Sequence, residues 1–242
     1  MILDEIVAAK RAELAIVRER RPFLAALQAP SGLAVIAECK KASPSAGVIS
    51  EAYDPAALAR SYADGGAAAI SVLTERNYFS GSPEDLHAVR RAVTQPVLRK
   101  DFLFDPWQIT ESVAMGADAL LLIVAIVGPG TADMVSRALE AGIEPLVEVH
   151  DEREAEVALR SPARVIGINN RNLKDFSVDL GVTRRLAPVL ARAGRVVVTE
   201  SGIRGPQDLA GLRALGVKAC LVGQSAVQAA DAASHLRSLA CS

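Results

Sequence analysis

The stretch RVVVTESGIRGPQDLAGLRALGVKACLVGQSAVQAADAASHL, residues 195–236, decides the fold. It contains two short apolar runs, 195–200 and 219–223. Each run is followed by a glycine-containing turn and then by a segment with helix-forming composition, at 206–216 and 225–236. Continuously apolar strands that alternate with helices are typical of a parallel sheet covered by helices. This stretch therefore predicts two consecutive strand–helix units.

The same unit recurs along the chain, so that eight units fit between about residue 33 and residue 236. Eight units in 242 residues match the size of a (β/α)8 barrel. An open doubly wound sheet is the rival architecture, but no GxGxxG motif follows the first strand. We predict an α/β protein whose residues 1–242 form one domain, a TIM barrel. Its first six strands are predicted at 33–39, 67–73, 97–100, 117–125, 145–149 and 164–169.

Residues 1–32 are predicted to form an N-terminal helical extension. Apolar residues recur at the spacing of one face of an amphipathic helix over 2–21, which Pro22 ends. These residues are Leu3, Ile6, Val7, Leu14 and Val17. Two roles are open for this helix: it can plug one end of the barrel, or it can lean over the mouth and help to hold a substrate.

Composition excludes several classes of partner. Half of the residues are hydrophobic and the net charge is −1, so the chain lacks the positive excess that holds a nucleic-acid backbone. The most apolar run, 119–127, is far shorter than the roughly 20 residues that span a bilayer. The N-terminus carries early charges, unlike a secretory signal, and three scattered cysteines fit a reducing compartment. We expect a cytoplasmic protein that binds neither nucleic acid nor membrane, most simply a monomer, with an oligomer left open.

Polar side chains end the apolar strands. In a barrel, the carboxyl ends of the strands surround the mouth where chemistry occurs. Single charges there often only meet solvent, but many at one end predict an active site, because clustered charges shift one another's pKa values. Side-chain alternation predicts that Cys39 points away from Glu38 and Lys40. The polar residues at the strand ends are Glu38, Lys40, Lys100, Glu148, Asn169, Arg171, Glu200 and Ser201.

Glycines after the last two strands predict a phosphate site. Gly202 follows one strand, and Gly223 precedes Gln224 at the start of the last helical segment. Glycine lets backbone N–H groups approach an anion, helix N-termini favour negative charge, and barrel phosphate sites commonly lie at these strands. The loop 41–55 is longer than usual and contains Ser43, which can add a hydroxyl. It is either a lid over the substrate or a tolerated insertion.

Metal and nucleophile chemistry find little support in the sequence. His87, His150 and His235 lie on different predicted elements without ligand spacing, and no GxSxG, CxxC or Walker motif occurs. The proximity of His150 to Glu148 is weak evidence for a metal, and none is expected.

Eight segments of the chain carry a resemblance to a known family: IAECKKASPS (36–45), TERNYFSGSPEDL (74–86), VLRKDF (97–102), ALLLIVA (119–125), LVEVHD (146–151), IGINNRNL (166–173), TESGI (199–203) and LVG (221–223). In order and spacing, over nearly the whole chain, they resemble the indole-3-glycerol-phosphate synthase family. The resemblance implies a TIM-barrel lyase of tryptophan biosynthesis. Its members convert 1-(2-carboxyphenylamino)-1-deoxyribulose 5-phosphate to indole-3-glycerol phosphate, CO2 and water, without metal or organic cofactor.

The resemblance also implies roles for residues. Lys100 would be the general acid that protonates the ketone oxygen, and a lowered lysine pKa would suit that task. Lys40 would hold the carboxylate or share the acid role, and Glu148 would be the base of the dehydration. Glu38, Asn169 and Glu200 would orient the sugar hydroxyls and tune the lysines, with Arg171 near Asn169. Ser43, Gly202, Gly223 and the backbone of Gln224 would contact the phosphate. Phe79, Phe102 and Leu173 would form an apolar wall, and Ser201 would also belong to the site.

Two other functions stay open at this point. A Schiff-base aldolase acting on a phosphosugar would use a desolvated lysine, and a non-catalytic barrel would only bind phosphorylated ligands. The sequence also departs from the family pattern in three places, one of which, Thr110-Glu111-Ser112, falls in a predicted helix expected to lie outside the site. Gln224 stands where many members have a small hydroxyl residue, and Ala46 replaces a common basic residue.

Overall fold

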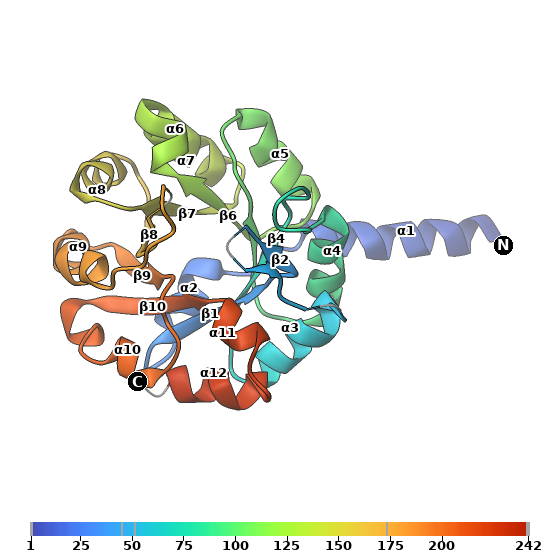
Figure 1. Cartoon of the computed structure of the whole chain (residues 1–242). Helices are drawn as coiled ribbons and strands as arrows, with labels where there is room; N and C mark the ends of the chain where they lie inside the picture. The colour runs from blue at the N-terminus through green and yellow to red at the C-terminus, as the bar shows by residue number, and fades with distance from the viewer. Residues whose placement is uncertain (1, 45, 51, 173, 241–242) are drawn as a thin grey trace.

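Eight parallel strands close into a barrel in the computed structural model, which describes residues 2–44, 46–50, 52–172 and 174–240 (Figure 1). Around the barrel the order is β1-β10-β9-β8-β7-β6-β5-β4, and the ends pair because β1 is also parallel to β4. The predicted TIM barrel is therefore confirmed. The strands are β1 (Ala34–Cys39), β4 (Ala69–Leu73), β5 (Val97–Lys100), β6 (Ala119–Ile123), β7 (Glu144–Val149), β8 (Val165–Asn169), β9 (Val196–Glu200) and β10 (Val217–Val222).

Helices follow the strands and cover the outside of the barrel (Figure 1). Several begin at a side-chain cap: Asp54, Ser82, Asp105 and Asp151 each accept a hydrogen bond from a backbone N–H of the first turn. Proline follows the first three caps, where its missing N–H costs nothing. The covering helices are α3 (Pro55–Asp64), α4 (Pro83–Ala92), α5 (Pro106–Ala114), α7 (Thr131–Glu140), α8 (Glu152–Leu159), α9 (Gly181–Arg192), α10 (Pro206–Leu209) and α12 (Ala232–Ala240).

Some predicted boundaries are wrong. The predicted strand 117–125 ends at Ile123, because Val124–Val127 forms the short helix α6, followed by the turn η1 (Gly128–Gly130). An apolar run does not by itself distinguish strand from buried helix. The last two helical segments are each broken in two, which adds η2 (Arg213–Leu215) and α11 (Gln224–Val227).

The interior of the barrel is apolar below its mouth, and α2 (Phe23–Gln28) closes the opposite end. Phe23 and Leu27 of α2 are 1% exposed and pack in the same cluster as the inward residues of the strands. Residues just before α2 anchor it, since the backbone N–H of Arg21 donates to Asp118 Oδ1 at 2.8 Å. The plug is therefore α2.

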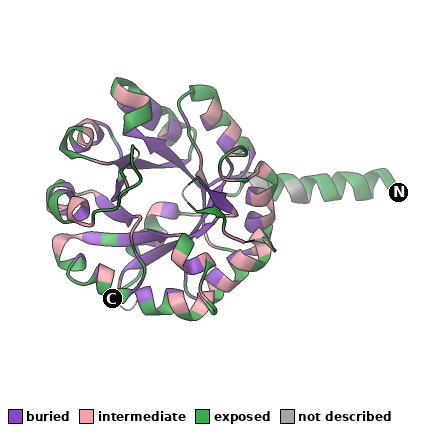
Figure 2. Cartoon of the chain, in the orientation of Figure 1, coloured by how far each residue is buried: buried purple, intermediate pink, exposed green. Residues whose placement is uncertain are grey.

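The first helix, α1 (Ile2–Arg18), projects from the barrel (Figure 1). Its apolar residues Ile2, Leu3, Ile6 and Leu14 are more than half exposed, and the ribbon of α1 is largely green, the colour of exposed residues, in Figure 2. It ends at Arg18, before the expected residue 21, and it neither plugs the barrel nor covers its mouth. No helix among the described residues has both the length and the apolar character needed to cross a membrane.

Candidate active site

A cavity of about 1030 Å³ opens at the carboxyl ends of the strands. Leu173 lies outside the described residues, and all other predicted site residues line this cavity. They are Glu38, Lys40, Ser43, Phe79, Lys100, Phe102, Glu148, Asn169, Arg171, Glu200, Ser201, Gly202, Gly223 and Gln224. The barrel therefore brings these scattered residues to one place.

Four charged side chains form the top layer of the barrel interior. Glu38, Lys100, Glu148 and Glu200 come from β1, β5, β7 and β9, which are alternate strands around the barrel. Side chains of one layer in such barrels are contributed by alternate strands. Two residues earlier on the same strands, the inward side chains are Ile36, Leu98, Leu146 and Val198, all buried.

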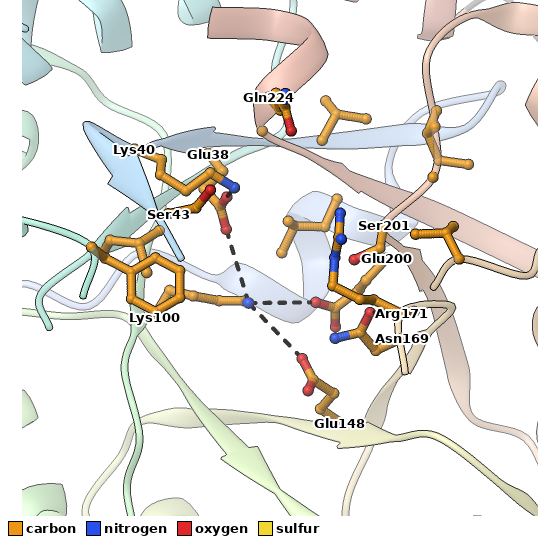
Figure 3. A pocket seen from close by; sticks show the side chains of 18 of the residues that line it. Glu38, Lys40, Ser43, Lys100, Glu148, Asn169, Arg171, Glu200, Ser201 and Gln224 are labelled. Carbon is orange, nitrogen blue, oxygen red and sulfur yellow. Dashed lines mark hydrogen bonds and ion pairs between the residues drawn. The ribbon is translucent and has the colours of Figure 1, made fainter. Parts of the chain in front are cut away.

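The Lys100 ammonium lies at the centre of this layer (Figure 3). Its Nζ is 3.9 Å from Glu38 Oε2, 3.9 Å from Glu148 Oε2 and 3.8 Å from Glu200 Oε2. Burial lowers the pKa of Lys100, but the three carboxylates outweigh burial and raise the pKa above its ordinary value. The expectation of a lowered lysine pKa is wrong here, and Lys100 is held protonated.

Lys40 forms a shorter ion pair with Glu38, 2.6 Å between Nζ and Oε1. Burial raises the pKa of Glu38, but Lys40 and Lys100 together bring it below its usual value. Cys39 points the other way into the core, as alternation predicts, and burial raises the pKa of its thiol. A Cβ at Gly223 would overlap the Glu38 carboxylate and lie 3.1 Å from Lys40 Nζ, so a side chain at this position would displace the ion pair.

Glu148 and Glu200 have pKa values displaced in opposite directions. Burial and repulsion from Glu148 raise the pKa of Glu200. Burial also raises the pKa of Glu148, but His150 and Lys100 more than compensate and lower it. Among the described residues, both oxygens of Glu200 and Oε2 of Glu148 are buried without a hydrogen-bond partner, and Oε1 of Glu148 lies 3.2 Å from His150 Nε2. Two neighbouring carboxyl groups with separated pKa values can take different roles in acid–base chemistry.

The loops after β9 and β10 form the side of the cavity where the sequence predicts phosphate binding. Ser201 (φ 64°) and Gly202 (φ 84°) adopt the left-handed region after β9, and α11 begins directly after Gly223. The Ser225 hydroxyl donates to Ile203 O at 3.0 Å and joins the two loops. Both loops line the cavity, through residues 201–204 and 223–225.

The long loop after β1 contains a small hairpin, β2 (Ala42–Ser43) and β3 (Gly47–Val48). Ser43 is buried there and faces the cavity. The apolar wall is formed by Phe79 and Phe102, with ring centroids 6.0 Å apart. Glu75 shapes its loop, because its carboxylate accepts hydrogen bonds from the backbone N–H groups of Tyr78 and Phe79, at 2.7 and 3.1 Å.

Comparison with known proteins agrees with this geometry. A sequence model described as indole-3-glycerol phosphate synthase matches residues 3–239. The chain belongs to this family. An indole-3-glycerol phosphate synthase of Aromatoleum aromaticum is 48% identical and the match covers 98% of both chains. Indole-3-glycerol phosphate synthase 2 of Streptomyces coelicolor is 51% identical, over 90% of this chain and 84% of its own.

The barrel is also similar to a solved structure of low identity. An N-acetylmannosamine-6-phosphate 2-epimerase from Clostridium perfringens superposes with a TM-score of 0.65 and 15% identity, over 86% of this chain and 91% of that chain. At this identity the likeness shows the fold alone.

Sequence reasoning missed two polar residues of this indole-3-glycerol phosphate synthase family member. Asn170 is buried, its amide donates to Thr199 Oγ1 and to the carbonyl oxygens of Glu200 and Ser201, and its Oδ1 accepts from Thr183. It therefore fixes the ends of β8 and β9.

The second missed residue is His150, which contacts Glu148. Its Nε2 is 3.2 Å from Glu148 Oε1, and the available signal was the two-residue spacing, which places both side chains on one side of the chain.

Proposed function

We propose that this chain catalyses indole-ring formation from 1-(2-carboxyphenylamino)-1-deoxyribulose 5-phosphate, with release of CO2 and water, through the residues of the top layer and its rim. The observation that carries the proposal is the position of Lys100, whose Nζ lies within 4 Å of three carboxylates in a cavity of about 1030 Å³. General acid–base chemistry needs groups held in defined protonation states within reach of the reacting atoms.

In the first half of the reaction, the aryl carbon that bears the carboxylate forms a bond to the ketone carbon. Lys100 donates a proton to the ketone oxygen, which becomes a hydroxyl group. The carboxylate then leaves as CO2, and its bonding electron pair restores the aromatic ring. Lys40 lies beside Glu38 at the same rim and holds the substrate carboxylate until it leaves.

In the second half, the new hydroxyl group leaves as water. This departure consumes a second proton, which Lys40 helps Lys100 to supply. One proton must also leave the five-membered ring. Glu148 accepts that proton, since its pKa is lowered and one of its oxygens has no hydrogen-bond partner among the described residues. Two protons are donated and one is accepted, which balances the loss of the carboxylate as neutral CO2.

The other lining residues bind the rest of the substrate. Ser43 and the backbone at Gly202, Gly223 and Gln224 cradle the phosphate, so the side chain of Gln224 is not required for that contact. Glu38, Asn169 and Glu200 orient the sugar hydroxyls, with Arg171 and Ser201 beside them. Phe79 and Phe102 provide an apolar wall for the carboxyphenyl ring.

The test is an assay of the purified chain with the carboxyphenylamino ribulose phosphate. An increase in indole fluorescence without added metal, unchanged by chelator, is expected. Borohydride added with phosphosugar ketoses should trap nothing, because a Schiff base needs a neutral amine and Lys100 is held as ammonium. Absent turnover would refute the proposal, and covalent trapping at Lys100 would favour the aldolase.

A further inference from the structure

His150 lies between two carboxylates at the end of β7. Its Nε2 is 3.2 Å from Glu148 Oε1, and its Nδ1 is 2.9 Å from Glu154 Oε2 on α8. A neutral imidazole carries a proton on one nitrogen only, so one of these contacts would oppose a lone pair to a carboxylate oxygen. Nε2 makes no hydrogen bond among the described residues, so its contact with Glu148 is electrostatic. Both contacts are favourable together when each nitrogen carries a proton, and the geometry therefore favours an imidazolium ion.

We infer that His150 is a positioning residue: clamped by Glu154 as a permanent cation, it anchors one oxygen of Glu148 and leaves the other free for the reaction. Glu148 Oε2 is buried, has no hydrogen-bond partner among the described residues, and is 3.9 Å from Lys100 Nζ. The inference rests on the proposed function in one respect, the use of Glu148 as the base.

The charged groups around Glu148 support separate roles for its two carboxylate oxygens. Glu148 is faced by Lys100 from β5, Asn169 from β8, Glu200 from β9 and, more remotely, Glu38 from β1. The neighbouring carboxylates of Glu200 and Glu38 favour protonation of Glu148. A second cation, in addition to Lys100, is therefore needed to keep Glu148 ionised.

His150 itself is faced by Glu148 and by Glu154. Burial lowers the pKa of His150, but the two carboxylates outweigh burial and raise it to about 10. Glu154 is held in place, since its Oε2 also accepts from the backbone N–H of His150 at 2.8 Å and its own N–H donates to Asp151 Oδ1. Glu154 is thus the clamp, and its loss should lower the pKa of His150.

The first test is NMR of the ring nitrogens of 15N-histidine-labelled protein, with His150 assigned by comparison with His150→Gln. In the wild-type chain the ring should remain doubly protonated well above the ordinary histidine pKa of about 6.5. Glu154→Gln should lower this pKa by more than about one unit. The matched control is Glu152→Gln, because exposed Glu152 in the same helical turn pairs with Arg185 and should leave the titration unchanged.

The second test is the pH profile of turnover for His150→Gln, which can keep a hydrogen bond but loses the charge. Its acid limb should move to higher pH, because Glu148 loses a cation, and kcat should fall at least tenfold with little change in KM. A wild-type His150 that titrates near 6.5, or an unmoved acid limb in His150→Gln, would overturn the inference. The NMR result decides it even if the wild-type chain shows no turnover, which would instead refute the proposed function.

Discussion

Replacement of Lys100 by methionine should separate its chemical role from its structural one. The change removes the cation that lies 3.8–3.9 Å from three buried carboxylates and keeps an unbranched apolar chain. Loss of a general acid typically costs about 10²–10⁴ in rate. We expect kcat to fall by that amount, equivalent to about 2.7–5.4 kcal/mol of activation free energy, while the phosphate contacts keep substrate binding largely intact.

The same change should make stability depend on pH. Removal of one partner from a buried ion pair costs about 3–5 kcal/mol when the other charge stays ionised. Without the ammonium, at least one of the carboxyl groups has a folded-state pKa above its unfolded value. Protonation of that group stabilises the folded variant at low pH, and this contribution is lost as the pH rises through the folded-state pKa. The deficit relative to the wild type should therefore grow from about pH 5.5 to about pH 8.5.

Urea unfolding at the two pH values and the fluorescence assay measure both effects. The matched variant is Lys100→Arg, which keeps a cation but is a poor proton donor, because a guanidinium stays protonated in proteins. It should restore much of the stability and little of the turnover. Near-normal turnover in Lys100→Met would refute the assignment and make Lys40 the acid. A deficit that shrinks with rising pH would refute the electrostatic reasoning.

Three further outcomes are expected. Gly223→Ala should lower kcat/KM by more than about tenfold, because the added Cβ overlaps the Glu38 carboxylate, whereas Gly130→Ala meets only Val127 at 3.7 Å and should be silent; equal activities would contradict the site geometry. Phe23→Ala should lower the free energy of unfolding by about 3–5 kcal/mol and Tm by roughly 6–20 °C, whereas deletion of residues 2–18 should change Tm little. Scanning calorimetry measures both values, and a larger loss from the deletion would refute α2 as the plug. Glu148→Gln should reduce kcat about 10²–10⁴-fold with substrate affinity retained in a binding assay, and unchanged turnover would exclude it as the base.

The fold could be predicted from the sequence because its units repeat and each strand is apolar. Position within a strand was also predictable: alternation placed Cys39 in the core and Lys40 at the mouth. The path of the N-terminal segment could not be predicted. Amphipathic spacing shows that α1 has an apolar face, but it does not show what that face contacts. For the same reason the apolar run through Val124 concealed a change from strand to helix.

The protonation states of the site were beyond sequence reasoning. Burial alone lowers the pKa of a lysine. At Lys100 the pKa is raised instead, because three carboxylates lie within 4 Å of the ammonium. Those carboxylates are separated from it by roughly 50 to 100 residues along the chain, a range of spacing at which no local pattern reports contact. His150 was set aside for a different reason: its spacing from Glu148 was weighed only as weak evidence for a metal, and not as a contact between an imidazole and two carboxylates.

The layered interior explains why these charges must compensate one another. Directly below the charged layer, the same four strands carry Ile36, Leu98, Leu146 and Val198, so water reaches the charges only from the mouth. A substrate that fills the mouth removes that remaining water and strengthens every interaction within the layer. Charges solvated separately would lose most of their hydration at that moment, whereas charges already paired with one another lose little. The barrel therefore presents a preorganised set of acids and bases to the substrate, and it does so because polar side chains replace the topmost apolar layer on alternate strands.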